Sequence, residues 1–274
     1  MVRRRPARRG DALTIDSVAA YSVTGGAWQL GPGRIYDRLA AVLVARSPAS
    51  LLGRRVLDVG AGTGAASRAA LDAGAASVVA IDAAVGMLAH QSTARPAAVA
   101  ADALALPFPD ASFDAALAAF SLNHLTDPAG GLREMSRVTR PGAPLVAGSY
   151  AADDDHPVKA AVQAALEARG WAPEPWYLTV KTDAVPLLST IRRAQAVAAA
   201  AGLDAVCERV RVAFPELDAR DLVAWRLGMA QHAPFVARLS PDDRERVEAD
   251  AMARLGDPPR PLVRSILVLR AVKP

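Results

Sequence analysis

The stretch Val56-Leu57-Asp58-Val59-Gly60-Ala61-Gly62-Thr63-Gly64 decides the fold. It is an apolar strand that runs directly into a glycine-rich turn, and the Ala-rich segment that follows is typical of a helix. Glycine permits backbone conformations with positive φ and lets a ligand approach where a Cβ atom would collide. Because open α/β sheets bind ligands at the carboxyl ends of their strands, the sequence predicts a binding loop here.

Outward from this loop, apolar strands alternate with helical segments. Strands are predicted at 55–59, 77–81, 97–101, 113–120, 143–149, 204–213 and 262–272, and helices at 65–73, 84–91, 128–139 and 185–201. Such alternation predicts an α/β, Rossmann-like, doubly wound and mostly parallel sheet with helices on both faces.

The segments around this core predict five parts of the chain. These are a disordered basic arm at 1–12, an N-terminal helical lid at 13–50 with two helical patches, a core at 51–150, a substrate-covering insertion and helix at 151–202, and the last strands at 203–274 with a helical insertion at about 218–256. Between 150 and 183 the pattern is irregular, with prolines among the aromatic residues, and predicts loop structure.

Composition limits the classes of function. Of the 274 residues, 52% are hydrophobic and 22% charged, without an apolar run near the roughly 18 to 20 residues that a membrane span requires. Five arginines lie within the first nine residues, and without them 27 basic residues face 28 acidic ones, so the body is close to neutral. The arm lacks the apolar region of a signal peptide. A single cysteine, Cys207, excludes an internal disulfide, and a soluble chain in the cytoplasm is expected.

The glycine loop by itself leaves the ligand open. Gly60, Gly62 and Ala65 also fit the looser dinucleotide fingerprint G-x-G-x-x-G/A. Asp82 ends the next predicted strand about 20 residues later, where a carboxylate can accept both hydroxyls of an adenosine ribose. The same aspartate is also a suitable N-cap for the following helix. Nicotinamide enzymes and S-adenosylmethionine (SAM) enzymes share both features.

Three further passages separate these classes. They are Ala-Asp-Ala at 101–103, Leu-Pro-Phe-Pro-Asp-Ala-Ser-Phe-Asp at 106–114 with Leu-Asn-His-Leu at 122–125, and Arg-Glu-Met-Ser-Arg-Val-Thr-Arg-Pro-Gly at 133–142. Over residues 54 to 150 the sequence resembles the class I SAM-dependent methyltransferases, in their small-molecule subgroup. Thr139 and Ala143 depart mildly from the family pattern. The resemblance implies a seven-stranded sheet whose last strand is antiparallel, SAM as methyl donor and S-adenosylhomocysteine as product.

The resemblance also implies roles for individual residues. The methionine moiety of SAM would be held by Asp58 with Gly60, Ala61, Gly62 and Gly64, and its tail would be lined by Phe120 and Ser121. The ribose would be bound by Asp82. The adenine would lie against Ala83 and Met87, and its edge would meet Asp102 and Ala103. Met87 is equally suited to core packing, and Asp102 to capping a turn.

Methyl transfer to a hydroxyl or an amine requires a base, and His124 is the best candidate because it follows the fourth strand. A purely structural histidine at a strand end is the alternative. His90, His156 and His232 are weaker candidates. His156 follows three aspartates, but acidic residues in a loop are more often solvated than metal-binding, so no metal site is predicted.

The substrate pocket is expected to come from aromatic residues outside the shared core, some of which will be ordinary core instead. The candidates are Tyr21, Trp28, Tyr36, Trp176, Tyr177 and Trp225, together with His124.

Alternatives of other classes stay open. A nucleic-acid (RNA) methyltransferase is favoured only by the arginine arm, and the neutral body and the lack of an N/D-P-P-Y/F motif speak against it. An NAD-dependent oxidoreductase and a non-catalytic binding module are weaker alternatives. The sequence therefore predicts a bacterial small-molecule methyltransferase, and analogy at the level of the family places it in secondary metabolism. Neither nucleic acid nor a membrane is expected as a partner. The sequence does not indicate the acceptor atom or the oligomeric state.

Overall fold

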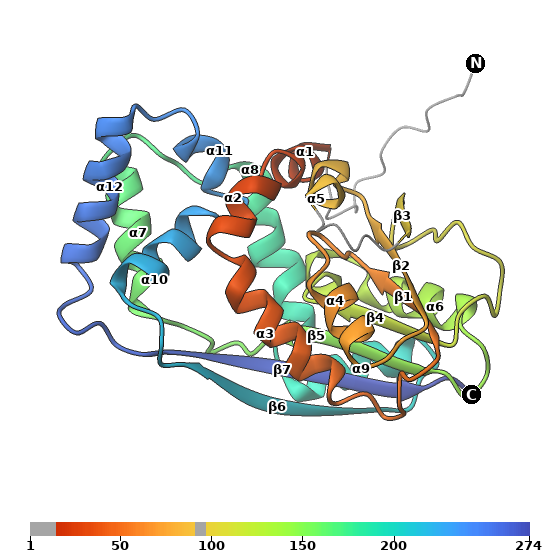
Figure 1. Cartoon of the computed structure of the whole chain (residues 1–274). Helices are drawn as coiled ribbons and strands as arrows, with labels where there is room; N and C mark the ends of the chain where they lie inside the picture. The colour runs from red at the N-terminus through yellow and green to blue at the C-terminus, as the bar shows by residue number, and fades with distance from the viewer. Residues whose placement is uncertain (1–14, 91–96) are drawn as a thin grey trace, which may run out of the picture.

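The computed structural model describes residues 15–90 and 97–274, which form a mixed sheet flanked by helices (Figure 1). The strands are β1 (Arg55–Val59), β2 (Ser77–Asp82), β3 (Ala97–Ala100), β4 (Ala115–Ala119), β5 (Pro144–Tyr150), β6 (Ala205–Phe214) and β7 (Leu262–Val272). Their order is β3-β2-β1-β4-β5-β7-β6. The first five pair in parallel, and β7 runs antiparallel to both of its neighbours. The predicted fold class is confirmed.

The central strands are buried on both faces because helices cover each of them. Neighbouring residues of one strand point to opposite sides, so Val56 belongs to one apolar core and Leu57 to the other. The first core is covered by α3 (Gly33–Val44) and α4 (Ala65–Asp72), and the second by α6 (Pro128–Val138) and α9 (Ile191–Ala200). This layering presents the carboxyl ends of the parallel strands at one edge.

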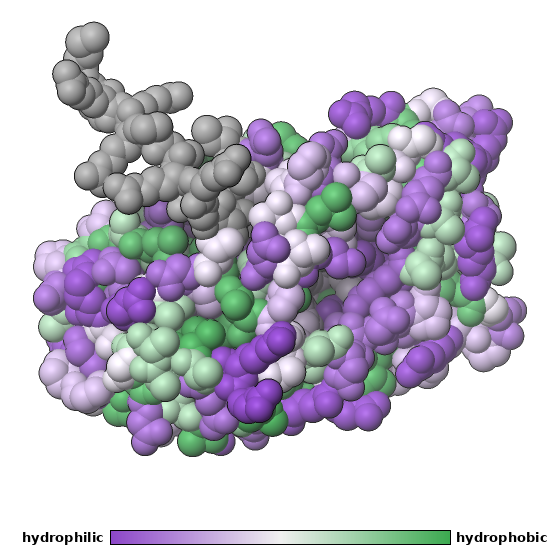
Figure 2. Space-filling view, turned by 180° about the vertical axis from the view of Figure 1, so that it is seen from behind, coloured by the Kyte–Doolittle hydropathy of each residue, from purple (hydrophilic) through white to green (hydrophobic). Residues whose placement is uncertain are grey.

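The remaining helices surround that edge and one end of the sheet (Figure 1). They are α1 (Ile15–Ser22), α2 (Gly25–Leu30), α5 (Val85–Ala89), α7 (Pro157–Glu167), α8 (Pro175–Thr179), α10 (Ala219–Leu227), α11 (Ala233–Val236) and α12 (Pro241–Ala253), with the short turns η1 (Leu122–His124), η2 (Val180–Ala184) and η3 (Val185–Leu188). The outer surface at the α12 end is largely hydrophilic (Figure 2). Within the described residues, none of the helices is both long and apolar enough to cross a membrane.

Several predicted elements need correction. The segment 150–183 is not irregular, since it contains α7, α8 and the π-helical turn η2. His156 caps α7 by accepting a hydrogen bond from the backbone of Val158, and Pro157 occupies the first turn. The apolar residues of α7 recur at helical spacing, which was the overlooked signal.

Other boundaries also differ. The two expected N-terminal patches are three helices, because Gly25 and Gly33 begin α2 and α3. The helix expected at 185–201 starts only at Ile191, after the proline-containing turn η3. The helical insertion expected at about 218–256 consists of α10, α11 and α12. The basic arm at 1–12 lies outside the described residues.

A buried ion pair joins the segment after β5 to β7. Asp154 accepts hydrogen bonds from Nε and Nη2 of Arg264 and from the backbone N–H of Ser265, at 2.7–3.1 Å. Both charged side chains are at most 5% exposed. The guanidinium of Arg264 lies 4.1 Å from the ring centroid of Tyr150. The pair therefore fixes the carboxyl end of β5, where Tyr150 ends the strand.

We expect Asp154→Ala to lower the free energy of unfolding by about 3–5 kcal/mol, because the substitution leaves Arg264 buried without its counterion. Asp153→Ala is the matched control, since Asp153 pairs with Arg209 at the surface and is 69% exposed, so its loss should cost less than about 1 kcal/mol. Urea unfolding followed by circular dichroism measures both values. Equal losses in the two variants would contradict a stabilising role for the buried pair.

Candidate functional site

The end of β1 places one carboxylate in the wall of a cavity at the carboxyl edge of the sheet. Asp58 is fully buried, and its Oδ2 accepts a 2.6 Å hydrogen bond from the Ser67 hydroxyl. Its Oδ1 is buried without a hydrogen-bond partner in the described part of the chain. Burial raises the pKa of Asp58 to about 6, against the opposing effect of Ser67. An unsatisfied carboxylate oxygen at a cavity wall is suited to accept from an ammonium group.

The glycines of the loop have different tasks. Gly62 has a φ of +54°, and a Cβ atom there would meet only the Met87 Cε atom, at 3.4 Å, so the position stays open toward the cavity. A Cβ atom at Gly60 would lie 2.2 Å from that of Ser121, so this glycine permits the close approach of the β4 end. Gly64 starts α4 as its N-cap residue, and it does not line the cavity.

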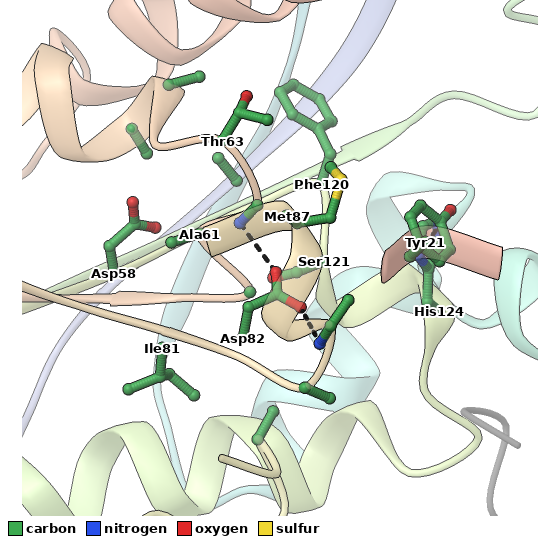
Figure 3. Close-up of a pocket in the computed structure, with 18 of the residues that line it drawn as sticks. Tyr21, Asp58, Ala61, Thr63, Ile81, Asp82, Met87, Phe120, Ser121 and His124 are labelled. Carbon is green, nitrogen blue, oxygen red and sulfur yellow. Dashed lines mark hydrogen bonds between the residues drawn. The ribbon is translucent and has the colours of Figure 1, made fainter. Parts of the chain in front are cut away.

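Asp82 at the end of β2 links two loops (Figure 3). Its two carboxylate oxygens accept from the backbone N–H groups of Gly62 and Ala84, each at 2.8 Å. Burial raises the pKa of Asp82. Each oxygen retains a further acceptor site, so the carboxylate can hold the loop and still accept from a diol.

Most of the expected residues surround the same cavity. Those that line it are Asp58, Gly60, Ala61, Gly62, Asp82, Ala83, Met87, Ala103, Phe120, Ser121, Tyr21, Trp28, Tyr36 and His124. Met229 was expected to help cover the pocket and does line it. The sequence reasoning missed Val18, Thr63, Ala65, Ala66, Ile81, Ala84, Ala101, Ala119, Leu125 and Tyr150. Of these, Tyr150 had a recognisable signal, because it ends a central strand at the edge that carries the site.

Five expected residues do not line the cavity, Gly64 among them. Asp102 is exposed and accepts from the backbone N–H of Leu104, as a turn-capping residue does. Trp176 packs in a cluster with Val180 and Ala230. The same cluster includes Tyr177 as a partly buried neighbour.

The fifth, Trp225, is 1% exposed within the core and lies under the guanidinium of Arg264. Packing against the helical insertion thus holds this ring away from the cavity.

Several aromatic rings line the cavity together with the residues of the glycine loop. Neighbouring ring centroids are 6.5 Å apart for Tyr21 and Trp28, 4.7 Å for Trp28 and Tyr36, 5.8 Å for Tyr36 and Phe120, and 4.8 Å for Phe120 and Tyr150. Phe120 has a φ of 61°, an uncommon conformation for a non-glycine residue. Such rings suit a flat apolar ligand.

His124 and Tyr21 face each other beside these rings (Figure 3). The Tyr21 hydroxyl lies 3.4 Å from His124 Nδ1. Burial lowers the pKa of His124 to about 4 and raises the pKa of Tyr21 far above its usual value. At neutral pH the imidazole is therefore uncharged and the phenol protonated.

The other histidines have structural partners or lie at the surface. His156 caps α7 through Nδ1, and its Nε2 donates to the carbonyl of Arg260. His232 is 1% exposed and its Nδ1 bonds the carbonyl of Arg226. His90 is exposed at the end of α5. Over residues 15–90 and 97–274, no group of three or more His, Cys, Asp or Glu side chains is arranged to hold a metal ion.

Comparison with known proteins agrees with this geometry. Residues 57–147 match the family model described as a methyltransferase domain. A demethylmenaquinone methyltransferase of Renibacterium salmoninarum is 43% identical over 142 residues, which are 51% of this chain and 58% of that protein. Its counterpart from Mycolicibacterium gilvum is 42% identical over 136 residues, 49% of this chain and 58% of the relative. The chain thus matches somewhat over half the length of these relatives.

Solved structures extend the likeness in fold to most of the chain. A SAM-dependent methyltransferase from Thermotoga maritima has a TM-score of 0.55 at 15% identity, covering 94% of this chain and all (100%) of that one. The cyclase SpnF has a TM-score of 0.50 at 23% identity, covering 87% and 81%. At these identities the likeness concerns the fold alone. The match to a methyltransferase domain is confined to residues 57–147, and the strand order and the glycine loop with its two aspartates are similar to those of the class I SAM-dependent methyltransferases.

Proposed function

We propose that the chain binds SAM in this cavity and transfers its methyl group to a small molecule. The observation that carries the proposal is the buried Oδ1 of Asp58, which has no hydrogen-bond partner in the described residues and lies in the wall beside the open position at Gly62. A nicotinamide dinucleotide offers no ammonium group to this oxygen, whereas the methionine part of SAM does. The sulfonium of bound SAM supplies an activated methyl group.

The residues of the cavity divide between the parts of the cofactor. Asp58 accepts from the methionine amino group, and Asp82 accepts from the ribose hydroxyls while it holds Gly62 and Ala84. Met87, 3% exposed beside the loop, packs against the adenine together with Ala83 and Ala103. Phe120 and Ser121 border the methionine tail, with the Ser121 hydroxyl donating to the carbonyl of Val59 at 2.6 Å.

The aromatic part of the cavity holds the acceptor. Its walls are the rings of Tyr21, Trp28, Tyr36 and Tyr150, so a flat apolar molecule fits them better than a charged polymer does. Holding acceptor and methyl donor in line supplies much of the rate, because oriented proximity is worth roughly 7–11 kcal/mol. The helices α1 and α2, which supply Tyr21 and Trp28, pack beside α5 at this edge of the sheet (Figure 1).

His124 removes the proton of a hydroxyl or amine acceptor. In the tautomer whose Nδ1–H donates to the Tyr21 hydroxyl, Nε2 is free to take that proton. The pKa near 4 keeps the imidazole neutral and available at neutral pH.

Two biological settings are considered for the reaction, that of the curated relatives and that of bacterial secondary metabolism. The relatives named above are demethylmenaquinone methyltransferases, and the chain shares with them a small-molecule acceptor. A role in bacterial secondary metabolism rests on fold-level analogy. A screen of phenols and aryl acids with radiolabelled SAM identifies the acceptor by its labelled product. The screen distinguishes a quinol from other aromatic acceptors.

We expect Asp82→Ala to weaken SAM binding at least about tenfold, because hydrogen bonds to a charged group contribute about 1.5–3 kcal/mol and the glycine loop loses its anchor. Gly62→Val should abolish binding, since the new side chain occupies the open position at a positive φ. Calorimetric titration with SAM measures both. Asp72→Ala, an exposed carboxylate at the end of α4, is the control and should bind normally. Normal SAM affinity in the Gly62 variant would exclude the proposed site.

We expect His124→Gln to lower turnover by about 10²–10⁴-fold and to leave SAM affinity unchanged, because a general base acts on the acceptor only. Turnover is measured with an acceptor from the screen. An NMR titration of the His124 ring protons, assigned with the same variant, should give a pKa near 4. Protonation at pH 6, or undiminished turnover in the variant, would remove the proposed role.

A further inference from the structure

Exposed apolar side chains gather on the helices at the carboxyl edge of the sheet. They are Val23 directly after α1, Leu30 of α2, Val85 of α5 and Leu178 of α8, and we call them the rim patch. Val23 is 71% and Leu30 88% exposed, so most of each side chain is in contact with solvent. A single exposed apolar residue is ordinary, but a group of them on one face marks a binding surface.

The four positions are neighbours in space because their helices contact one another. The helix α1 packs against α5 and α8, and α2 packs against α5 (Figure 1). Gly86 of α5 lies so close to Ser22 of α1 that a Cβ atom at this glycine would collide with the Ser22 carbonyl. The Gln29 side chain of α2 donates a hydrogen bond to the His90 carbonyl at the end of α5. Three members of the rim patch directly adjoin these contacts in the sequence.

The helices that carry the rim patch also form part of the cavity wall. Val18 and Tyr21 come from α1, Trp28 from α2 and Met87 from α5, and all four residues line the cavity. Each of these helices thus contributes to the cavity on one side and to the exposed rim on another. A surface that covers the rim patch therefore lies beside the cavity.

Positive charge is tethered to the same rim. Residues 1–14 directly precede α1, and their five arginines and one aspartate account for the whole formal net charge of +4. An extended chain advances at most about 3.6 Å per residue, so Arg8 and Arg9 lie within about 25 Å of the first residue of α1. Among α1, α2, α5 and α8, only α1 carries a charged residue, Asp16. The rim therefore combines an apolar surface with an excess of cations.

This combination suits an anionic lipid surface better than a nucleic acid. Arginines are attracted to lipid phosphates, and aliphatic side chains enter the boundary between headgroups and acyl chains. Nucleic-acid phosphates attract arginines equally well, but single strands are bound by stacking of bases on exposed aromatic rings. None of the aromatic side chains in the part of the chain that the structure describes is exposed. The rim patch is thus explained by lipid and not by nucleic acid.

We propose that the rim patch and the arginines of residues 1–14 dock the protein on an anionic lipid bilayer, with the cavity edge of the sheet toward the membrane. The association is peripheral, since none of the described helices is able to span a bilayer. This inference revises the expectation from the sequence that a membrane is not a partner, which rested on the lack of a spanning run. Docking places the cavity where an apolar acceptor dissolved in the bilayer can reach it, but it does not depend on methyl transfer.

Sedimentation of the full-length protein with lipid vesicles tests the inference. We expect vesicles of phosphatidylcholine mixed with phosphatidylglycerol to bind the protein at least about tenfold more tightly than pure phosphatidylcholine, and added salt to reduce this difference. The double variant Val23→Ser, Leu30→Ser should lose at least about tenfold in affinity for the mixed vesicles, because it removes apolar contact and leaves all charges in place. Leu52→Ser is the matched control, since Leu52 is 75% exposed in the turn before β1, at the opposite edge of the sheet, and should bind like the unaltered protein.

A second pair of measurements separates the contributions. Arg8→Gln with Arg9→Gln in the full chain should weaken binding to the mixed vesicles and leave binding to pure phosphatidylcholine unchanged. Calorimetric titration with S-adenosylhomocysteine should give the same affinity in every variant, which shows that the fold and the cavity are retained. Absence of binding to mixed vesicles, unchanged binding in the Val23 and Leu30 variant, or tighter binding of polyuridylate than of mixed vesicles would overturn the inference. Failure of the unaltered protein to bind S-adenosylhomocysteine would instead reject the proposed function.

Discussion

The carboxylate of Asp82 accepts from the backbone N–H groups of Gly62 and Ala84, and the geometry of the site depends on these two hydrogen bonds. They fix the glycine loop after β1 to the turn after β2, at the edge where parallel strands end. Gly60 lets Ser121 approach from β4, so a third strand end joins them. Because the carboxylate is buried and hydrogen-bonded only to backbone, its position is set by the sheet and not by surface side chains. A cofactor meets a preformed surface on this side.

The aromatic part of the cavity wall is built differently. Its rings come from α1, α2, α3 and the ends of β4 and β5. Asp154 and Arg264 pair behind Tyr150 and fix it, while Nη1 of Arg264 stays buried without a hydrogen-bond partner among the described residues.

The sequence was sufficient to predict the sheet, the glycine loop and both aspartates, because these follow from local patterns such as apolar strands and a glycine turn at a fixed spacing. It was insufficient for the acceptor side. The end of β5 at Tyr150 was recognisable, but the place of its ring beside Arg264 depends on the antiparallel pairing of β5 with β7, which is a long-range effect. Trp225 does not line the cavity for the same reason, since its ring packs in the core under the guanidinium of Arg264. The missed α7 has a local cause, because the three aspartates at 153–155 before it and Pro157 in its first turn concealed a regular helical period.

Similarity of fold by itself leaves the chemistry open, as a cyclase of similar fold illustrates. We infer that the cavity binds SAM, with an oxygen of Asp58 accepting from its amino group. Parallel calorimetric titrations of the purified protein with SAM, S-adenosylhomocysteine and NADH test this binding. We expect micromolar binding of SAM and S-adenosylhomocysteine and no binding of NADH. Binding of NADH alone would contradict this inference.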